Sequence, residues 1–134
     1  EWHTRKDGKK IPFYIKRADN LPLAFAGIYD NWTNRSTGEI FDTFSIITTK
    51  ANELLAKIHN SKKRMPVILP ENNKEQWIDR NLSKNEIQAF INNLNPVELT
   101  AYTISKKILN KDLDISKPDI IQKTDYPDHP DLFK

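Results

Sequence analysis

One histidine and a basic triplet lie close together in this chain and could do chemistry on a phosphate-bearing partner. His59 follows a stretch with helical apolar spacing, and Lys62, Lys63 and Arg64 come shortly after it. Histidine titrates near neutral pH and can give or take a proton, and lysine and arginine neutralise phosphates. Each also has an ordinary interpretation: the helix dipole favours a histidine at a helix C-terminus, and a charged run is usually solvated.

Other residues could contact a nucleic acid or a metal. Trp2 is either a core residue or a platform on which a base stacks. Thr48, near the end of a predicted strand, either donates to a phosphate or satisfies local backbone groups. Glu1 would ordinarily be solvated at a chain terminus. His3 and His129 have no partner at metal-ligand spacing, and we predict both to be surface residues.

Length and composition predict one soluble domain. The chain has 134 residues, enough for one core, and zero cysteines, which excludes disulfides and a thiol nucleophile within it. Its three scattered glycines exclude a phosphate-cradling glycine loop. The longest apolar stretch, residues 22–29, is far shorter than the about 20 residues that span a bilayer. We therefore expect a cytoplasmic protein without metal or organic cofactor. Since the chain starts at Glu1 rather than Met, we expect an internal fragment or a trimmed product.

Charge is unevenly distributed along the chain. Residues 1–64 hold 12 Lys and Arg against 7 Asp and Glu, whereas residues 65–134 hold 9 against 11. Aromatic residues are interspersed among the basic ones in the first half. This pattern is compatible with a polyanionic partner, although charge alone decides little.

The order of predicted elements is that of an α+β fold with a mainly antiparallel sheet. A helix is predicted over 50–58 with Thr49 as its N-cap, and Ser83 with Glu86 forms a capping box that opens a second helix. Residues 1–106 are predicted to be the domain, and 107–134 a loosely packed tail. Strands are predicted over 11–17, 23–30 (a buried one), 40–48, 65–69 and 97–104.

Four short motifs in unbroken order resemble the SOS response-associated peptidase (SRAP) family. They are Glu1-Trp2, Leu23-Ala-Phe-Ala-Gly-Ile28, Ile46-Ile-Thr-Thr-Lys-Ala-Asn52, and Ile58-His59 with Arg64-Met-Pro-Val-Ile-Leu69. The resemblance covers roughly residues 1–77, and linked motifs at family-like spacing are far more specific than one short pattern. One departure is the longer, more basic loop between His59 and Arg64.

The resemblance implies a compact, barrel-like β-rich domain that binds single-stranded DNA and reacts with abasic sites. In this family an N-terminal cysteine captures the abasic aldehyde with its amine and thiolate, and an autoproteolytic peptidase activity accompanies this reaction. The family's catalytic glutamate and histidine correspond to Glu1 and His59. Its cysteine and asparagine lie upstream and have no counterpart here, so the chain is similar to the downstream portion of such a domain. The resemblance assigns DNA binding to Trp2, Thr48, Arg64, Lys62 and Lys63.

Single-stranded DNA with abasic sites is therefore the expected partner of a monomeric, SRAP-type enzyme, although this chain alone, without the cysteine, is expected to be inactive. Two alternatives remain open. The chain could be a non-catalytic module that binds single-stranded DNA, or a protein-interaction domain whose basic loop binds an acidic partner. Substitution of His59 distinguishes the enzyme from the plain binding module.

Overall fold

The computed structural model describes residues 1–110, 112–114 and 116–127, so His129 lies outside the described residues. The predicted α+β class is confirmed, because short helices accompany strands that pair in small sheets. The chain divides into two units, each assembled from separate stretches. Unit 1 comprises residues 1–21, 50–64 and those from 98 onward, and unit 2 comprises residues 22–49 and 65–97.

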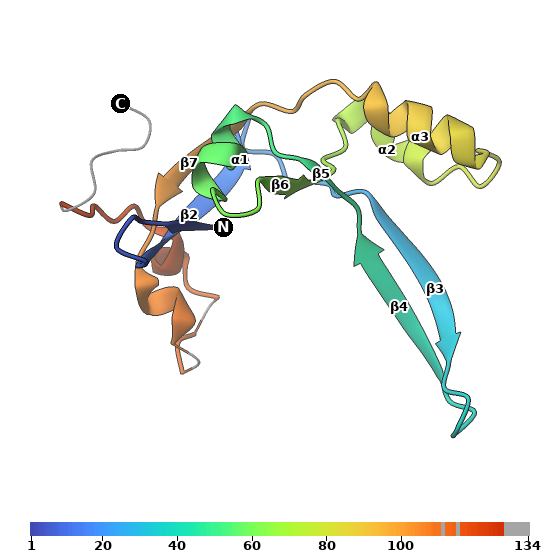
Figure 1. Cartoon of the computed structure of the whole chain (residues 1–134), viewed down its shortest axis with the longest axis horizontal. Helices are drawn as coiled ribbons and strands as arrows, with labels where there is room; N and C mark the ends of the chain where they lie inside the picture. Colours follow the sequence, from blue (N-terminus) through green and yellow to red (C-terminus); the bar gives the residue numbers. More distant parts are fainter. Residues whose placement is uncertain (111, 115, 128–134) are drawn as a thin grey trace. The chain divides into compact units, whose positions relative to one another are not determined.

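A three-stranded antiparallel sheet forms the centre of unit 1, with β2 between β1 and β7 (Figure 1). Helix α1 contributes Ile58, which is fully buried beside Ile11 and Phe13 of β2. These β-branched and aromatic side chains suit a central strand whose face is covered by a helix. The elements of unit 1 are β1 (Trp2–Thr4), β2 (Lys10–Arg17), α1 (Glu53–Ile58), β7 (Leu99–Thr103) and the 3-10 helices η2 (Lys106–Leu109) and η3 (Pro118–Ile121).

Unit 2 combines a long β-hairpin with short helices. Its core contains Ala26, Val67, Leu69 and Phe90, so the described residues bury two separate clusters rather than the single core predicted from chain length. The elements are β3 (Gly27–Thr33), β4 (Ile40–Ile46), η1 (Glu71–Asn73), α2 (Lys74–Trp77) and α3 (Lys84–Asn92).

Both predicted helices exist, but one begins later than expected. Ser83 and Glu86 form the predicted capping box at the start of α3. The helix predicted over 50–58 begins only at Glu53, and its N-cap is Asn52, whose side chain accepts a hydrogen bond from the Leu55 N–H. The prediction of Thr49 as the cap is wrong because residues 48–50 form strand β5 (Thr48–Lys50), which delays the helix.

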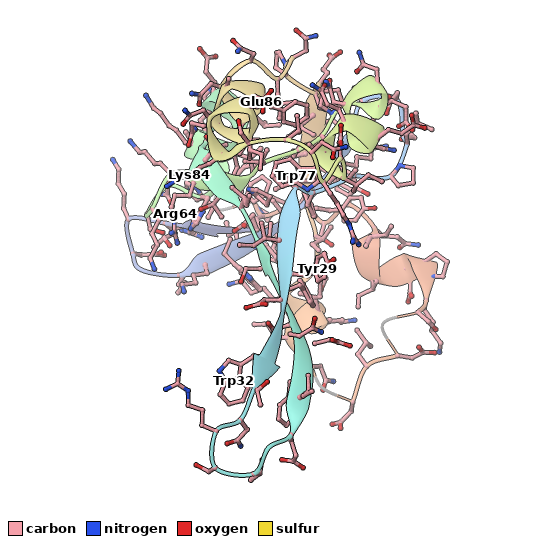
Figure 2. The ribbon with its side chains drawn as sticks, turned by 90° about the vertical axis from the view of Figure 1, so that its right-hand side faces the viewer. Tyr29, Trp32, Arg64, Trp77, Lys84 and Glu86 are labelled. Carbon is pink, nitrogen blue, oxygen red and sulfur yellow. The ribbon has the colours of Figure 1, made fainter. Side chains whose placement is uncertain are left out.

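The strand predicted over 23–30 is displaced and exposed. It runs over Gly27–Thr33 and, among the described strands, pairs only with β4, so the two strands form a ribbon whose large apolar side chains remain accessible. Tyr29 is 72% exposed and Trp32 is 54% exposed. They lie on opposite faces of the hairpin, as a spacing of three residues in a strand requires (Figure 2).

The described strands do not close into a barrel. Besides the sheet of unit 1 and the β3–β4 hairpin, β5 pairs with β6 (Arg64–Pro66), and the boundary between the two units passes through both of these strands. The expected barrel-like arrangement is therefore absent from the part of the chain that the structure describes. The expected antiparallel pairing of strands is confirmed.

Part of the segment predicted as a loosely packed tail packs against the core of unit 1, the unit to which it belongs. The Tyr126 hydroxyl donates to the Ile104 carbonyl at 2.8 Å, and its ring packs against the Ile11–Phe13–Ile58 cluster. Burial raises the pKa of Tyr126 above its usual value. The boundary between residues 106 and 107 stays a prediction. No helix within the described ranges is long and apolar enough to cross a membrane.

Candidate functional site

The backbone of Glu1 and Trp2 is ordered by its pairing with β2. The Phe13 N–H donates to the Glu1 carbonyl at 2.8 Å, and the Glu1 amino group donates to the Phe13 carbonyl at 3.1 Å. Trp2 lies opposite Pro12 and is half-buried, whereas the Glu1 side chain is exposed. The carboxylate of Glu1 is thus accessible to a reacting group, and part of Trp2 is accessible to solvent.

His59 lies at the C-terminal end of α1, where two contacts orient it. Its N–H donates to the Leu55 carbonyl at 2.7 Å, and its ring Nδ1 lies 3.1 Å from the Arg64 carbonyl oxygen. A carbonyl can only accept, so Nδ1 is the donor in this contact. The position also satisfies the interpretation of His59 as a histidine that the helix dipole favours.

Three long-range hydrogen bonds join the end of α1 to β1. The Thr4 N–H donates to Asn60 Oδ1 at 3.0 Å, and Asn60 Nδ2 donates to the Thr4 carbonyl at 2.8 Å. His3 Nδ1 donates to the Lys57 carbonyl at 2.8 Å. In Figure 1, α1 and the loop that follows it lie beside β1. We call these three bonds the β1–α1 clamp. The clamp brings the segment of Glu1 and Trp2 and the segment of His59 to the same part of unit 1.

His3 corrects one prediction. It was expected at the surface, but it is only 8% exposed. Its ring meets Phe13 edge-on, with centroids 6.4 Å apart, while its Nδ1 bonds to the main chain of α1. The residues next to His3 in the sequence do not indicate that it is buried. Asn60, which bonds to Thr4, was not among the predicted site residues, and its sequence neighbours do not indicate this contact either. Both partners of these residues lie more than 50 positions away.

The basic triplet forms the exposed end of the loop after His59. Lys62, Lys63 and Arg64 are all exposed, and none of them forms an ion pair with another described residue. The loop is held by its backbone: the Lys63 N–H donates to the His59 carbonyl at 3.0 Å, and the Ala51 N–H donates to the Lys63 carbonyl at 3.0 Å. Lys63 adopts a left-handed conformation with φ of 50°. Arg64, which is labelled in Figure 2, is the first residue of β6.

The remaining predicted site residue, Thr48, belongs to unit 2. It is the first residue of β5 and its side chain is exposed. The predicted site residues that belong to unit 1 are Glu1, Trp2, His59, Lys62, Lys63 and Arg64. Across the described ranges, no cluster of three or more His, Asp and Glu side chains could hold a metal ion.

Comparisons with known proteins give one consistent result. The family model described as SOS response associated peptidase (SRAP) matches residues 1–111. The chain is 36% identical over 109 residues to the abasic site processing protein YoqW of Bacillus subtilis, covering 81% of this chain and 47% of that protein. It is 34% identical over 114 residues to YobE of the same organism, also an abasic site processing protein, covering 84% of this chain and 50% of YobE.

A solved structure is similar over most of the chain. A crystal structure of a protein from Bacteroides thetaiotaomicron, a structural genomics target, superposes with a TM-score of 0.80 at 40% sequence identity. The match covers 92% of this chain and 52% of that protein. The chain thus spans about half the length of the curated relatives and of the solved structure that it matches.

Proposed function

Since the chain belongs to the SRAP family, we propose that it is part of a protein that binds single-stranded DNA and becomes covalently joined to it at abasic sites. The named relatives are abasic site processing proteins. The observation that carries the proposal is the β1–α1 clamp, which holds the segments of Glu1 and His59 together beside an exposed basic loop.

The proposed chemistry uses a cysteine that lies outside this sequence. Its amine adds to the aldehyde carbon of the abasic sugar and water leaves, which gives a Schiff base. The thiolate then adds to the same carbon and closes a thiazolidine ring. Proteolysis by the same nucleophile, the family's peptidase activity, is a second proposed reaction. Neither reaction needs a metal or an organic cofactor.

Glu1 and His59 are proposed to move the protons that this chemistry requires. The exposed carboxylate of Glu1 accepts a proton from the attacking amine. His59 donates from Nε2 to the ring oxygen of the sugar, which opens the sugar to its aldehyde form. The bond from Nδ1 to the Arg64 carbonyl supports this assignment because it orients the ring and leaves Nε2 available to the sugar.

The other residues are proposed to hold the DNA. Trp2 stacks on a base, which contributes roughly 1–3 kcal/mol. Lys62, Lys63 and Arg64 neutralise phosphates, and Thr48 donates to a phosphate from unit 2. We expect this binding to weaken steeply as the salt concentration rises.

The test uses a protein in which this chain is joined to the part of the family domain that carries the N-terminal cysteine. It is incubated with single-stranded DNA holding one abasic site, and covalent adducts are resolved on a denaturing gel. We expect a heat-stable adduct that forms much more slowly with His59→Ala, while noncovalent affinity for intact DNA stays unchanged. His129→Ala is the matched control, since that histidine is not assigned to the site.

Two results would count against the proposal. If the folded protein binds DNA but forms no adduct, the non-catalytic DNA-binding module is the better interpretation. If it binds no DNA and instead retains an acidic protein, the interaction domain is favoured.

A further inference from the structure

The turn between β1 and β2 carries a second group of basic side chains. Within it, Asp7 is the single acidic residue, and its carboxylate is engaged: Oδ2 lies 3.2 Å from Arg5 Nη2, and Oδ1 accepts the Lys9 N–H at 3.1 Å. The lysines of the turn are exposed and form no ion pair with any other residue in the described part of the chain. The basic residues are Arg5, Lys6 and Lys9, together with Lys10, the first residue of β2, which we count with the turn.

Backbone hydrogen bonds hold this turn in one conformation. The Arg5 N–H donates to the Lys9 carbonyl at 2.8 Å, and the Gly8 N–H donates to the Arg5 carbonyl at 3.0 Å. Gly8 has a φ of 80°, a left-handed conformation that glycine adopts without strain. The lysines are therefore presented from an ordered turn, which lowers the conformational entropy that a ligand must restrict.

The turn starts where the β1–α1 clamp is attached. Thr4 is the last residue of β1, and its backbone is bonded on both sides to the amide of Asn60. Asn60 belongs to the loop that carries Lys62, Lys63 and Arg64. The clamp thus joins two basic segments. Residues 57–64 contain no acidic side chain that would neutralise the positive charges of Lys62, Lys63 and Arg64.

We infer that the β1–β2 turn is a second DNA-contacting segment, on which Lys6, Lys9 and Lys10 bind backbone phosphates beyond the reactive site. This inference rests on the proposed function. A DNA strand carries one negative charge per nucleotide, so a long regular anion can engage two basic segments that are held at a fixed spacing. A compact acidic ligand would need only one of them.

The experiment measures binding of unmodified single-stranded DNA by fluorescence anisotropy over a series of salt concentrations. The test variant is Lys6→Gln/Lys9→Gln/Lys10→Gln. The matched control is Lys107→Gln/Lys117→Gln/Lys123→Gln, which removes the same charge from three exposed positions of unit 1. All six side chains are exposed, so both variants should fold. The unfolding midpoints of both variants check that they do.

The expected change is in the salt dependence. On single strands, each lost phosphate contact reduces the steepness of log K against log salt by about 0.7. The slope of the turn variant should therefore be shallower by about 2, and the slope of the control should change much less. The turn variant should also bind a 12-nucleotide strand several-fold more weakly than the unmodified chain, yet match it on a 4-nucleotide strand. Equal slopes for the two variants would overturn the inference and leave the proposed function intact. These titrations use the joined protein described above, and no DNA binding by that protein without the lysine substitutions would overturn both.

Discussion

The side chain of Asn60 hydrogen-bonds both backbone groups of Thr4, 56 positions away in the chain. The Thr4 N–H donates to Oδ1 at 3.0 Å, and Nδ2 donates to the Thr4 carbonyl at 2.8 Å. This is the exchange of two bonds that a residue of a neighbouring antiparallel strand would make. A single amide therefore takes the place of a strand at the outer edge of β1, and it does so immediately after His59.

Replacing Asn60 with alanine should destabilise the chain by about 1–3 kcal/mol, because both backbone groups of Thr4 lose their partner in a part-buried position. Asn60→Asp keeps the acceptor and loses the donor, so an intermediate loss is expected. The free energy of unfolding in urea is the measurement. Asn95→Ala, at an exposed position, is the control. If Asn60→Ala is as stable as the control, the Asn60–Thr4 bonds do not stabilise the fold.

The Arg17–Asp19 pair should make stability depend on pH. Arg17 is 7% exposed, and its Nε and Nη2 donate to the Asp19 carboxylate at 2.9 Å and 2.6 Å. These bonds hold the pKa of Asp19 below its ordinary value. Because the folded pKa lies below the unfolded one, the pair stabilises the fold above the unfolded pKa of about 3.9 and is lost as the pH falls through the folded pKa.

Urea midpoints of the unmodified chain and Asp19→Asn provide the check. The variant should be less stable at about pH 6, and the difference should shrink below about pH 3. Asp125→Asn, at an exposed carboxyl, should show no such dependence. A stability gap between Asp19→Asn and the unmodified chain that stays constant with pH would contradict the assignment.

The capping box of α3 makes a local prediction. The Ser83 N–H donates to Glu86 Oε2 at 2.7 Å. The pKa of Glu86 lies below its ordinary value, chiefly because of a hydrogen bond with the Ser83 side chain and secondly because of this backbone bond. Ser83→Ala should cost about 1 kcal/mol of stability and raise the pKa of Glu86 toward its ordinary value. NMR titration of the Glu86 carboxyl measures the second effect, with Ser36→Ala as the control. An unchanged Glu86 pKa in Ser83→Ala would show that the hydroxyl contributes nothing.

Local features of this kind are the part of the fold that the sequence predicts well. The Ser83–Glu86 spacing contains all the information that its hydrogen bonds require. Near residue 50, however, Thr49 and Asn52 are both acceptable caps, and the choice depends on whether residues 48–50 pair as a strand. That pairing involves β6, which the local pattern does not specify.

Burial and long-range contacts were harder to predict from the sequence. The apolar run over 23–30 indicated a buried strand, yet the strand lies in a two-stranded ribbon with exposed faces. His3 looked like a surface residue because its partner, the Lys57 carbonyl, is 54 positions away. Sequence motifs found the candidate residues Glu1 and His59. They could not reveal the clamp that brings the two segments together, since Asn60 resembles any loop asparagine.

Trp77 should matter more to stability than Trp32. The Trp77 indole N–H donates to the Gly27 carbonyl at 3.1 Å, and its ring stacks on Phe90. Trp77→Phe keeps an aromatic ring but removes the hydrogen bond, which should cost about 0.5–1.5 kcal/mol. Trp32→Phe, at an exposed position, should change stability by less than about 0.5 kcal/mol. Urea unfolding followed by circular dichroism measures both variants, and a larger loss for Trp32→Phe would contradict the prediction.

Lys63 should separate the conformation of the basic loop from its charge. Its φ of 50° costs a non-glycine residue about 1–2 kcal/mol. Lys63→Gly removes this strain, while the greater freedom of glycine in the unfolded chain takes back about 0.5–1 kcal/mol. The result should lie between no change and a stability gain of about 1.5 kcal/mol. Lys63→Val, which is β-branched, should instead lose stability.

DNA binding should change in the opposite direction to stability. Lys63→Gly and Lys63→Asn both remove one positive charge and both tolerate the left-handed conformation, so each should weaken binding and lower the salt slope by about 0.7. Anisotropy titrations of single-stranded DNA and urea unfolding measure the two effects on the same samples, with Lys107→Gln as the charge-matched control. If Lys63→Gly binds DNA as tightly as the unmodified chain, Lys63 contacts no phosphate. If Lys63→Val is as stable as Lys63→Gly, the left-handed conformation carries no cost.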